Sequence, residues 1–322
     1  MRAIVVREFG PPSVMRLQDV ADPAASAGTL VVRVRAAGVN PVDTYIRSGT
    51  YARLPHLPYT PGFDGAGEVE SIGDGVTGWA RGDHVFIAAL GAWHGTYAER
   101  MVCTPSQVFR LPDHVSYGQG ASLGVPAATA HRALFGKAHA QGGETVLIHG
   151  ASGAVGIAAV QLAKAAGLRV IGTAGTDDGR ALVLEQGADT VFDHRDPARV
   201  SSIKTVTDAR GPDVILEMLA NVNLDTDLGL LAQGGRVVVI GNRSRTEIDA
   251  RQTMGKELTI TGMSLWNVPP DEMLRIQQAL AAALANRTLR PVVGREFPLE
   301  DAPQAHEVVT DQGARGKVVL NP

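Results

Sequence analysis

Six short apolar segments alternate with helical patterns between Glu144 and Gly262, and this alternation constrains the fold more than any other feature of the sequence. Apolar segments with few polar residues are typical of strands that are buried on both faces of a sheet. Strands that alternate with helices pair in parallel, so we predict a doubly wound α/β domain. The expected strands are TVLIHG (from Thr145), RVIGTAG (from Arg169), TVFDH (from Thr190), DVILE (from Asp213), RVVVIG (from Arg236) and LTITG (from Leu258).

A glycine-rich loop, HGASGAVG (149–156), follows the first of these strands and precedes a helical pattern. Gly150, Gly153 and Gly156 would allow a tight turn, a close approach to a pyrophosphate and close packing of the helix on the strand. The spacing is GxxGxxG rather than GxGxxG, and by itself it fits a plain strand-to-helix turn equally well. Within a six-stranded Rossmann domain the pattern favours a dinucleotide site at the helix N-terminus.

The end of the second strand indicates which dinucleotide binds. Its sequence, GTAGT (172–176), lacks the acidic residue that accepts hydrogen bonds from the ribose 2′-hydroxyl of NAD. We therefore expect NADPH, with Asp177 and Asp178 capping the next helix. The candidate donors to the 2′-phosphate, each also explicable as a solvated surface group, are Arg180, His194 and Arg243.

The segments outside this region have a different pattern. Before Ala121, short strands such as RAIVV (from Arg2) and TLVVRVRAAGV (from Thr29) are separated by many Gly and Pro residues, which predicts a β-rich, barrel-like unit. After Leu265 we expect a long helix, a strand, a short helix and a final strand, KVVLN. A chain of 322 residues is long enough for two domains.

Charge and cysteine content exclude several classes of function. Thirty basic and 33 acidic residues give a net charge of -3 without a Lys/Arg block, so nucleic acid is not an expected partner. Cys103 is the only cysteine, which excludes an intramolecular disulfide and a four-cysteine zinc site. No apolar run is long enough to span a bilayer, and we expect a cytoplasmic protein.

Five stretches closely resemble the zinc-free quinone oxidoreductases, the zeta-crystallin family of the medium-chain dehydrogenase/reductase superfamily. They are AAGVNPVDTYIRSGTY (from Ala36), LPYTPGFDGAGEVESIGDGV (from Leu57), GTYAE (from Gly95), VLIHGASGAVGIAAVQLAKA (from Val146) and ILEMLANVNL (from Ile215). The resemblance implies a GroES-like catalytic domain made from residues 1–122 and 265–322. It also implies a Rossmann domain over residues 123–264 that binds NADPH.

The resemblance also implies which residues contact the cofactor. The pyrophosphate loop would be 152–155, Gly175 and His194 would surround the adenosine phosphate, and Tyr45 would lie beside the cofactor. The full set is Tyr45, Thr129, Ser152, Gly153, Ala154, Val155, Gly175, His194, Asn223, Ile240, Gly241, Asn242, Arg243, Met263, Ser264 and Leu265.

The zinc-dependent alcohol dehydrogenases of the same superfamily provide a contrast. Their catalytic zinc is held by two cysteines and a histidine, and the matching positions here are Asn40, Phe63 and Val125. None of these residues supplies a thiolate or an imidazole. We therefore expect no metal and a metal-free reductase.

Without a metal, a side chain must stabilise or protonate the oxygen of the reduced acceptor. Asn40, Tyr45 and Tyr51 are the candidate catalytic hydrogen-bond donors, and Tyr45 is the first choice. The alternative for Tyr45 is a packed ring with a satisfied hydroxyl. A quinone needs little acid help because its reduced anion is delocalised, so loss of Tyr45 would alter binding more than turnover.

The expected activity is reduction of a quinone, with ortho-quinones favoured. The alternatives are reduction of an enoyl ketone or thioester and, outside enzymes, an RNA-binding or crystallin-type structural role. The complete glycine loop and the lack of a basic stripe favour the enzyme. The sixth strand, around LTITG, is expected to pair across a two-fold axis in a homodimer or a dimer of dimers.

Overall fold

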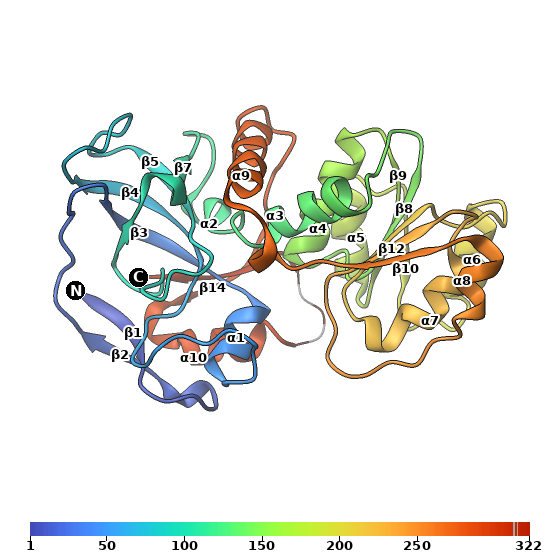
Figure 1. The fold of residues 1–322 in the computed structure, drawn as a ribbon, viewed down its shortest axis with the longest axis horizontal. Helices are drawn as coiled ribbons and strands as arrows, with labels where there is room; N and C mark the ends of the chain where they lie inside the picture. Colours follow the sequence, from blue (N-terminus) through green and yellow to red (C-terminus); the bar gives the residue numbers. More distant parts are fainter. Residues whose placement is uncertain (312, 314) are drawn as a thin grey trace. The chain divides into compact units, whose positions relative to one another are not determined.

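The computed structural model describes residues 1–311, 313 and 315–322, and the chain divides into two compact units (Figure 1). Unit 1 comprises Met1–Ala128 and Pro269–Pro322, and unit 2 comprises Thr129–Val268. These divisions fall a few residues beyond the boundaries expected from the sequence. The helix α3 (Pro126–His131) runs through the first division, so no loop marks it in the sequence.

Unit 2 is built on the predicted parallel sheet, which has six strands in the described part of the chain. The strands lie in the order β10-β9-β8-β11-β12-β13, and every neighbouring pair is parallel. Relative to the chain this order is 3-2-1-4-5-6, the doubly wound arrangement of dinucleotide-binding domains. The strands are β8 (Thr145–Ile148), β9 (Arg169–Ala174), β10 (Thr190–Asp193), β11 (Val214–Glu217), β12 (Arg236–Val239) and β13 (Thr259–Gly262).

Helices cover both faces of this sheet (Figure 1). Two pack against β8, β9 and β10 on one face, α4 (Ala154–Ala165) and α5 (Asp177–Glu185). The other face carries α6 (Arg199–Val206), α7 (Ala220–Leu230) and α8 (Arg251–Lys256). Gly167 and Gly187 follow α4 and α5 with φ of 80° and 110°, conformations that end a helix at little steric cost for glycine.

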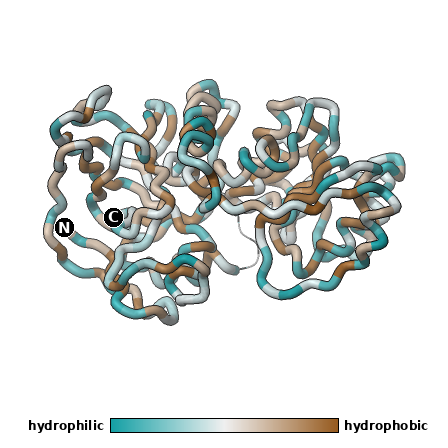
Figure 2. Tube along the Cα trace, in the orientation of Figure 1, coloured by the Kyte–Doolittle hydropathy of each residue, from teal (hydrophilic) through white to brown (hydrophobic). Residues whose placement is uncertain are grey.

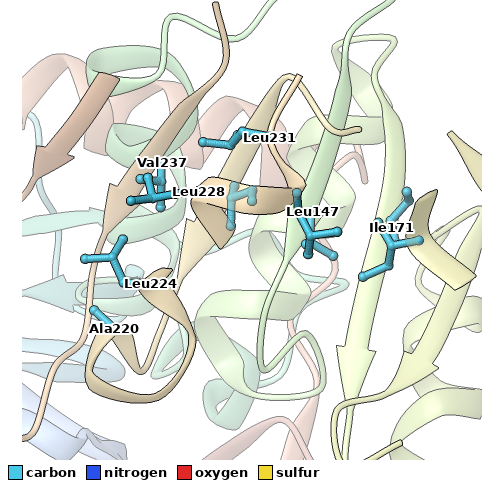
Figure 3. Packing of buried hydrophobic residues seen from close by; sticks show 10 residues of the cluster. Leu147, Ile171, Ala220, Leu224, Leu228, Leu231 and Val237 are labelled. Carbon is cyan, nitrogen blue, oxygen red and sulfur yellow. The ribbon is translucent and has the colours of Figure 1, made fainter. Parts of the chain in front are cut away.

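A continuous apolar core fills the space between the sheet and α7. Leu224, Leu228 and Leu231 project from this helix segment onto Leu147 and Val237 of the sheet (Figure 3). The central strands are correspondingly hydrophobic along their length, whereas the outer loops are largely hydrophilic (Figure 2). Burial of this stripe fixes α7 on the sheet, and with it the loop that connects β11 to α7.

Unit 1 is the predicted β-rich unit. It has a two-stranded sheet, β1-β2, and a seven-stranded sheet in the order β14-β15-β3-β4-β5-β7, with β6 paired to β3, among the described residues. Its strands are β1 (Arg2–Val6), β2 (Met15–Asp19), β3 (Leu30–Val39), β4 (Asp64–Ile72), β5 (His84–Ala88), β6 (Arg100–Cys103), β7 (Val108–Arg110), β14 (Val293–Pro298) and β15 (Lys317–Asn321). Its helices are α1 (Pro41–Arg47), α2 (Tyr117–Gly120), α9 (Pro270–Ala285) and α10 (Ala302–Val308).

The long strand β3 organises unit 1, because it pairs with three other strands. Its first half pairs with β6, its second half pairs with β15, and β4 pairs along its other edge. The C-terminal strand of the chain therefore lies beside the end of β3, where α1 begins. Within the described residues, no helix combines the length and the apolar character that crossing a membrane requires.

Candidate functional site

The glycine loop joins β8 to α4 at the carboxyl edge of the sheet in unit 2. Gly150 has a φ of 57°, and Gly153 is the N-cap residue of α4. A Cβ on Gly156 would lie 2.5 Å from the Cα of Ala151, so only glycine allows this packing of helix on strand. The first N–H groups of α4, from Ala154 onward, have no partners within the helix, and they offer hydrogen bonds and a positive dipole end to an anion.

Four residues surround the end of β9 and form a corner that we call the adenosine corner: Gly175, Asp193, His194 and Arg195. A Cβ on Gly175 would lie 2.6 Å from Cε1 of His194, so the ring packs directly over this glycine. Arg195 donates to the carbonyl of Gly175 and pairs with Asp193. The pKa of Asp193 is held at about 2 by this arginine. Burial and two nearby arginines lower the pKa of His194 despite the opposing charge of Asp193.

The sequence did not single out Arg195, which directly follows His194. The signal that could have found it is the pair of adjacent basic residues after the third strand. The ring of His194 packs over Gly175, and Arg195 donates to the carbonyl of the same glycine. Arg180 also reaches this corner, but it pairs with Asp177 and Asp193. Arg180 and Arg195 therefore share the carboxylate of Asp193, and Arg180 remains a candidate donor to the 2′-phosphate.

Two expectations about this corner change. The N-cap of α5 is Thr176, whose hydroxyl accepts from the N–H of Gly179, so the prediction that Asp177 and Asp178 cap the helix was wrong. Both aspartates lie in the first turn, where the helix dipole favours negative charge. Arg243 follows β12, three strand spacings or about 14 Å from β9, so it belongs to a different part of the sheet edge.

The residues expected around the nicotinamide gather at the ends of β11, β12 and β13. Nδ2 of Asn223 donates to Glu217 over 3.2 Å, and the carbonyl of Gly241 accepts from Ala220. The backbone N–H of Arg243 donates to Oδ1 of Asn221, and the carbonyl of Ser264 accepts from Arg132. Ile240 and Asn242 flank Gly241, while Met263 and Leu265 flank Ser264. Thr129 is buried at the start of unit 2, on α3.

Unit 1 contains a buried ion pair where β3 ends and β4 begins. Nζ of Lys317 lies 2.8 Å from Oδ2 of Asp64 and 2.5 Å from Oδ1 of Asn40, and all three side chains are at most 3% exposed. Nδ2 of Asn40 donates to the same oxygen of Asp64, and the N–H of Val125 donates to the other. Gly38 leaves room for the lysine, because a Cβ there would lie 2.6 Å from its Cε.

This arrangement does not fit a catalytic zinc ion. Asn40 and Val125 bind the carboxylate of Asp64, and Phe63 is a buried ring that packs edge-on against Trp93. The ammonium of Lys317 already supplies the positive charge that Asp64 and Asn40 face. A divalent cation here would meet one carboxylate, no thiolate and no imidazole, and it would be repelled by the lysine.

The three predicted catalytic side chains have different surroundings. Asn40 is buried and both ends of its amide are hydrogen-bonded. Tyr45, on α1, is half-buried, and its hydroxyl makes no hydrogen bond to any residue that the structure describes. Tyr51 is half-buried in the irregular segment after α1. Of the three, Tyr45 retains a hydrogen-bond donor for a ligand.

A second buried network lies beneath α1. Asp43 accepts from the backbone N–H of Asn40 and from the hydroxyl of Tyr97, which also lies 3.1 Å from Nε2 of His306. Burial raises the pKa of Asp43 to about 7. These contacts fix the start of α1, the helix that carries Tyr45.

Burial raises the pKa of the Cys103 thiol to about 12, as expected of an unreactive structural thiol.

Two sequence families match the chain. Residues 26–113 match the alcohol dehydrogenase GroES-like domain, and residues 154–282 match the zinc-binding dehydrogenase family. The first match lies in unit 1 and the second covers most of unit 2.

Similar proteins cover nearly the whole chain. A quinone oxidoreductase of Lama guanicoe is 49% identical over 99% of this chain and 97% of its own length. A mycobacterial protein solved in complex with NADPH is 32% identical, with a TM-score of 0.88 and full coverage of both chains. A quinone oxidoreductase of Escherichia coli, also solved with NADPH, is 28% identical with a TM-score of 0.88 and full coverage of both chains.

The buried ion pair gives a prediction for stability. We expect Lys317→Met to lower the free energy of unfolding by about 3–5 kcal/mol, because it leaves the Asp64 carboxylate buried without its cation. The matched control is Lys164→Met, which removes an exposed lysine paired with Asp189 over 2.8 Å and costs at most about 1 kcal/mol. Urea unfolding followed by circular dichroism measures both changes. Equal, small losses would contradict the role given to Lys317.

Proposed function

Because this chain belongs to the zeta-crystallin-type quinone oxidoreductases of the medium-chain dehydrogenase/reductase superfamily, we propose that it is an NADPH-dependent quinone reductase. The observation that carries this proposal is the carboxyl edge of the sheet in unit 2. There the glycine loop leads into the N-terminus of α4. At the end of β9, where NAD-dependent proteins have an acidic residue, this chain has Gly175 in contact with His194 and Arg195.

Each part of this edge would bind one part of the cofactor. The loop 152–155 would bind the pyrophosphate, with the backbone N–H groups of Ala154 and Val155 as donors, because the start of α4 leaves them without helical partners. Gly175, His194 and Arg195 would hold the 2′-phosphate, and the pairing of Arg195 with Asp193 positions the guanidinium group in advance. The nicotinamide end is held by Asn223, by 240–243 and by 263–265, at the ends of the last three strands.

When bound, NADPH supplies a hydride, or formally one electron at a time, to a conjugated acceptor. The chain contributes binding and electrostatics. Tyr45 would donate a hydrogen bond from its hydroxyl group to the developing oxyanion of the acceptor. Two observations support this role: the hydroxyl group has no other partner among the described residues, and buried hydrogen bonds fix the start of α1. Asn40 acts as a positioning residue, because its amide is already committed to Lys317 and Asp64.

We propose that the reaction requires no zinc. The support is the ammonium of Lys317, which neutralises Asp64 at the positions where related dehydrogenases hold their metal. The buried, unpaired Cys103 is compatible with a reducing, cytoplasmic location, which we also propose.

We further propose that the chain forms a homodimer through β13, alone or within a tetramer. This strand is at the edge of the sheet and pairs only with β12 among the described residues. Its side chains Thr259 and Ile260 are exposed. Thr259 and Met263 donate their N–H groups to the β12 side, so Ile260, one residue after Thr259, presents its own N–H outward. A second copy would pair with this open edge.

We expect the purified protein to oxidise NADPH when an ortho-quinone is present, which is measured as a loss of NADPH absorbance. We expect kcat/KM to be at least about tenfold lower with NADH, which cannot bond to the adenosine corner through a 2′-phosphate. A chelator should leave the rate unchanged. Selective turnover of an enoyl thioester under the same conditions would retain the cofactor but replace the quinone as substrate.

The role of Tyr45 predicts a particular kinetic change. Tyr45→Phe should raise KM for the quinone by about fivefold and change kcat less, because one hydrogen bond is lost while the reduced anion remains delocalised. Tyr117→Phe is the control, since that hydroxyl donates to Glu68 within unit 1. A drop in kcat of about a hundredfold or more at constant KM would instead make Tyr45 an essential acid.

The dimer is tested by light scattering on the purified protein. We expect a mass of at least twice 33.8 kDa, and we expect Ile260→Pro to yield the monomer because proline removes the outward N–H of β13. Ile260→Val retains that N–H and should remain oligomeric. A wild-type protein that is monomeric at working concentration would refute the proposal.

A further inference from the structure

Three buried titratable side chains meet directly behind the glycine loop of unit 2. His149 follows β8, Glu217 ends β11 and Asp227 lies on α7, and each is at most 3% exposed. Nε2 of His149 lies 2.9 Å from Oδ1 of Asp227 and 3.6 Å from Oε2 of Glu217. The other ring nitrogen lies 3.1 Å from the hydroxyl of Thr173 on β9. Burying two carboxylates this close is costly unless something neutralises one of them.

Glu217 connects this cluster to the nicotinamide end of the proposed site. Its Oε1 accepts from the N–H of Leu219 and from Nδ2 of Asn223. Its backbone carbonyl accepts from the N–H groups of Ile240 and Gly241. One residue therefore fixes the turn after β11, the first turns of α7 and the loop after β12.

The hydrogen-bond pattern indicates a shared proton. Oε2 of Glu217 and Oδ2 of Asp227 have no donor among the residues that the structure describes. A neutral His149 can donate from Nε2 to Asp227 and accept from Thr173 at Nδ1, which leaves none of its protons for these two oxygens. One proton held between the carboxyl groups satisfies both oxygens and leaves a single negative charge.

The surrounding charges agree with this count. Arg199 on α6 lowers the pKa of both His149 and Asp227, and it donates to the backbone carbonyl of His194 in the adenosine corner. Its positive charge favours the negative charge that remains on the pair. Burial raises the pKa of both carboxyl groups well above their usual range and lowers that of His149, so the pair retains a proton near neutral pH and loses it as the pH rises.

We propose that His149, Glu217 and Asp227 form a positioning cluster, in which one proton shared by the two carboxyl groups holds Glu217 so that it orients Asn223 and the Leu219 turn toward the nicotinamide. This proposal rests on the proposed NADPH site. Above neutral pH the cluster carries two adjacent carboxylates, and their repulsion loosens the residues that Glu217 holds. We expect the effect to be largest at the nicotinamide end, because that is where Glu217 makes its hydrogen bonds to Leu219 and Asn223.

The experiment compares two ligands of the full-length protein. NADPH has a nicotinamide, whereas adenosine 2′,5′-bisphosphate carries only the adenosine end, and both dissociation constants are measured by calorimetry between about pH 6 and pH 8.5. At the lower pH we expect Glu217→Leu to raise the dissociation constant of NADPH about tenfold and that of the bisphosphate less than about twofold. Glu217→Gln should restore NADPH binding, since an amide oxygen can accept from Asn223 while the amide nitrogen donates to Asp227.

The pH dependence separates positioning from a merely structural role. In the wild type, the preference for NADPH over the bisphosphate should fall above about pH 7, and in Glu217→Gln it should stay constant. Asp225→Asn is the control, because Asp225 is an exposed carboxylate on α7, the helix that carries Asp227. The Gln variant remains informative if Glu217→Leu fails to fold.

Three results would overturn the proposal: equal weakening of the binding of both ligands in Glu217→Leu, a ligand preference in Glu217→Gln that falls with pH as in the wild type, or a stoichiometric metal ion bound at this cluster. If the wild type bound the bisphosphate but not NADPH, or neither ligand, the proposed function would itself be wrong, which is a different outcome.

Discussion

The ion pair between Lys317 and Asp64 is the contact on which unit 1 depends. It joins a lysine of the last strand to an asparagine 277 residues earlier and to the first residue of β4. The two sequence segments of unit 1 flank the whole of unit 2, so contacts of this kind decide whether they form one core. A buried charge pair also demands one geometry, since any other arrangement leaves a carboxylate unpaired in a low dielectric.

Both units face the same physical problem, a carboxylate removed from water, and they solve it differently. Unit 1 pairs Asp64 with the side chain of Lys317, whereas unit 2 uses a shared proton between Glu217 and Asp227 with Arg199 nearby. A shared proton can be lost as the pH rises, so the position proposed for the nicotinamide depends on pH.

The adenosine corner shows how a surface with several acids can still select a phosphate. Asp193 pairs with both Arg180 and Arg195, and Arg195 also donates to the carbonyl of Gly175. The aspartate thus holds the guanidinium groups in place instead of facing the ligand. The glycine at position 175 leaves room for the ring of His194, which packs directly over it. Selection for NADPH would come from the missing acid as much as from the basic groups.

The sequence by itself determined the doubly wound sheet, the glycine loop and the missing zinc ligands, because each is written in consecutive residues or in a regular period. It also predicted His194 as a site residue, from its place after the third strand, and Tyr45, through the family resemblance. Only the tertiary structure decided that Lys317 neutralises Asp64, that Arg195 supports Gly175, and that His149 meets Asp227 78 residues away. Such pairs are separated along the chain by amounts that no local pattern encodes. They form because packing brings distant segments together and because buried polar groups must find their hydrogen-bond partners within the protein.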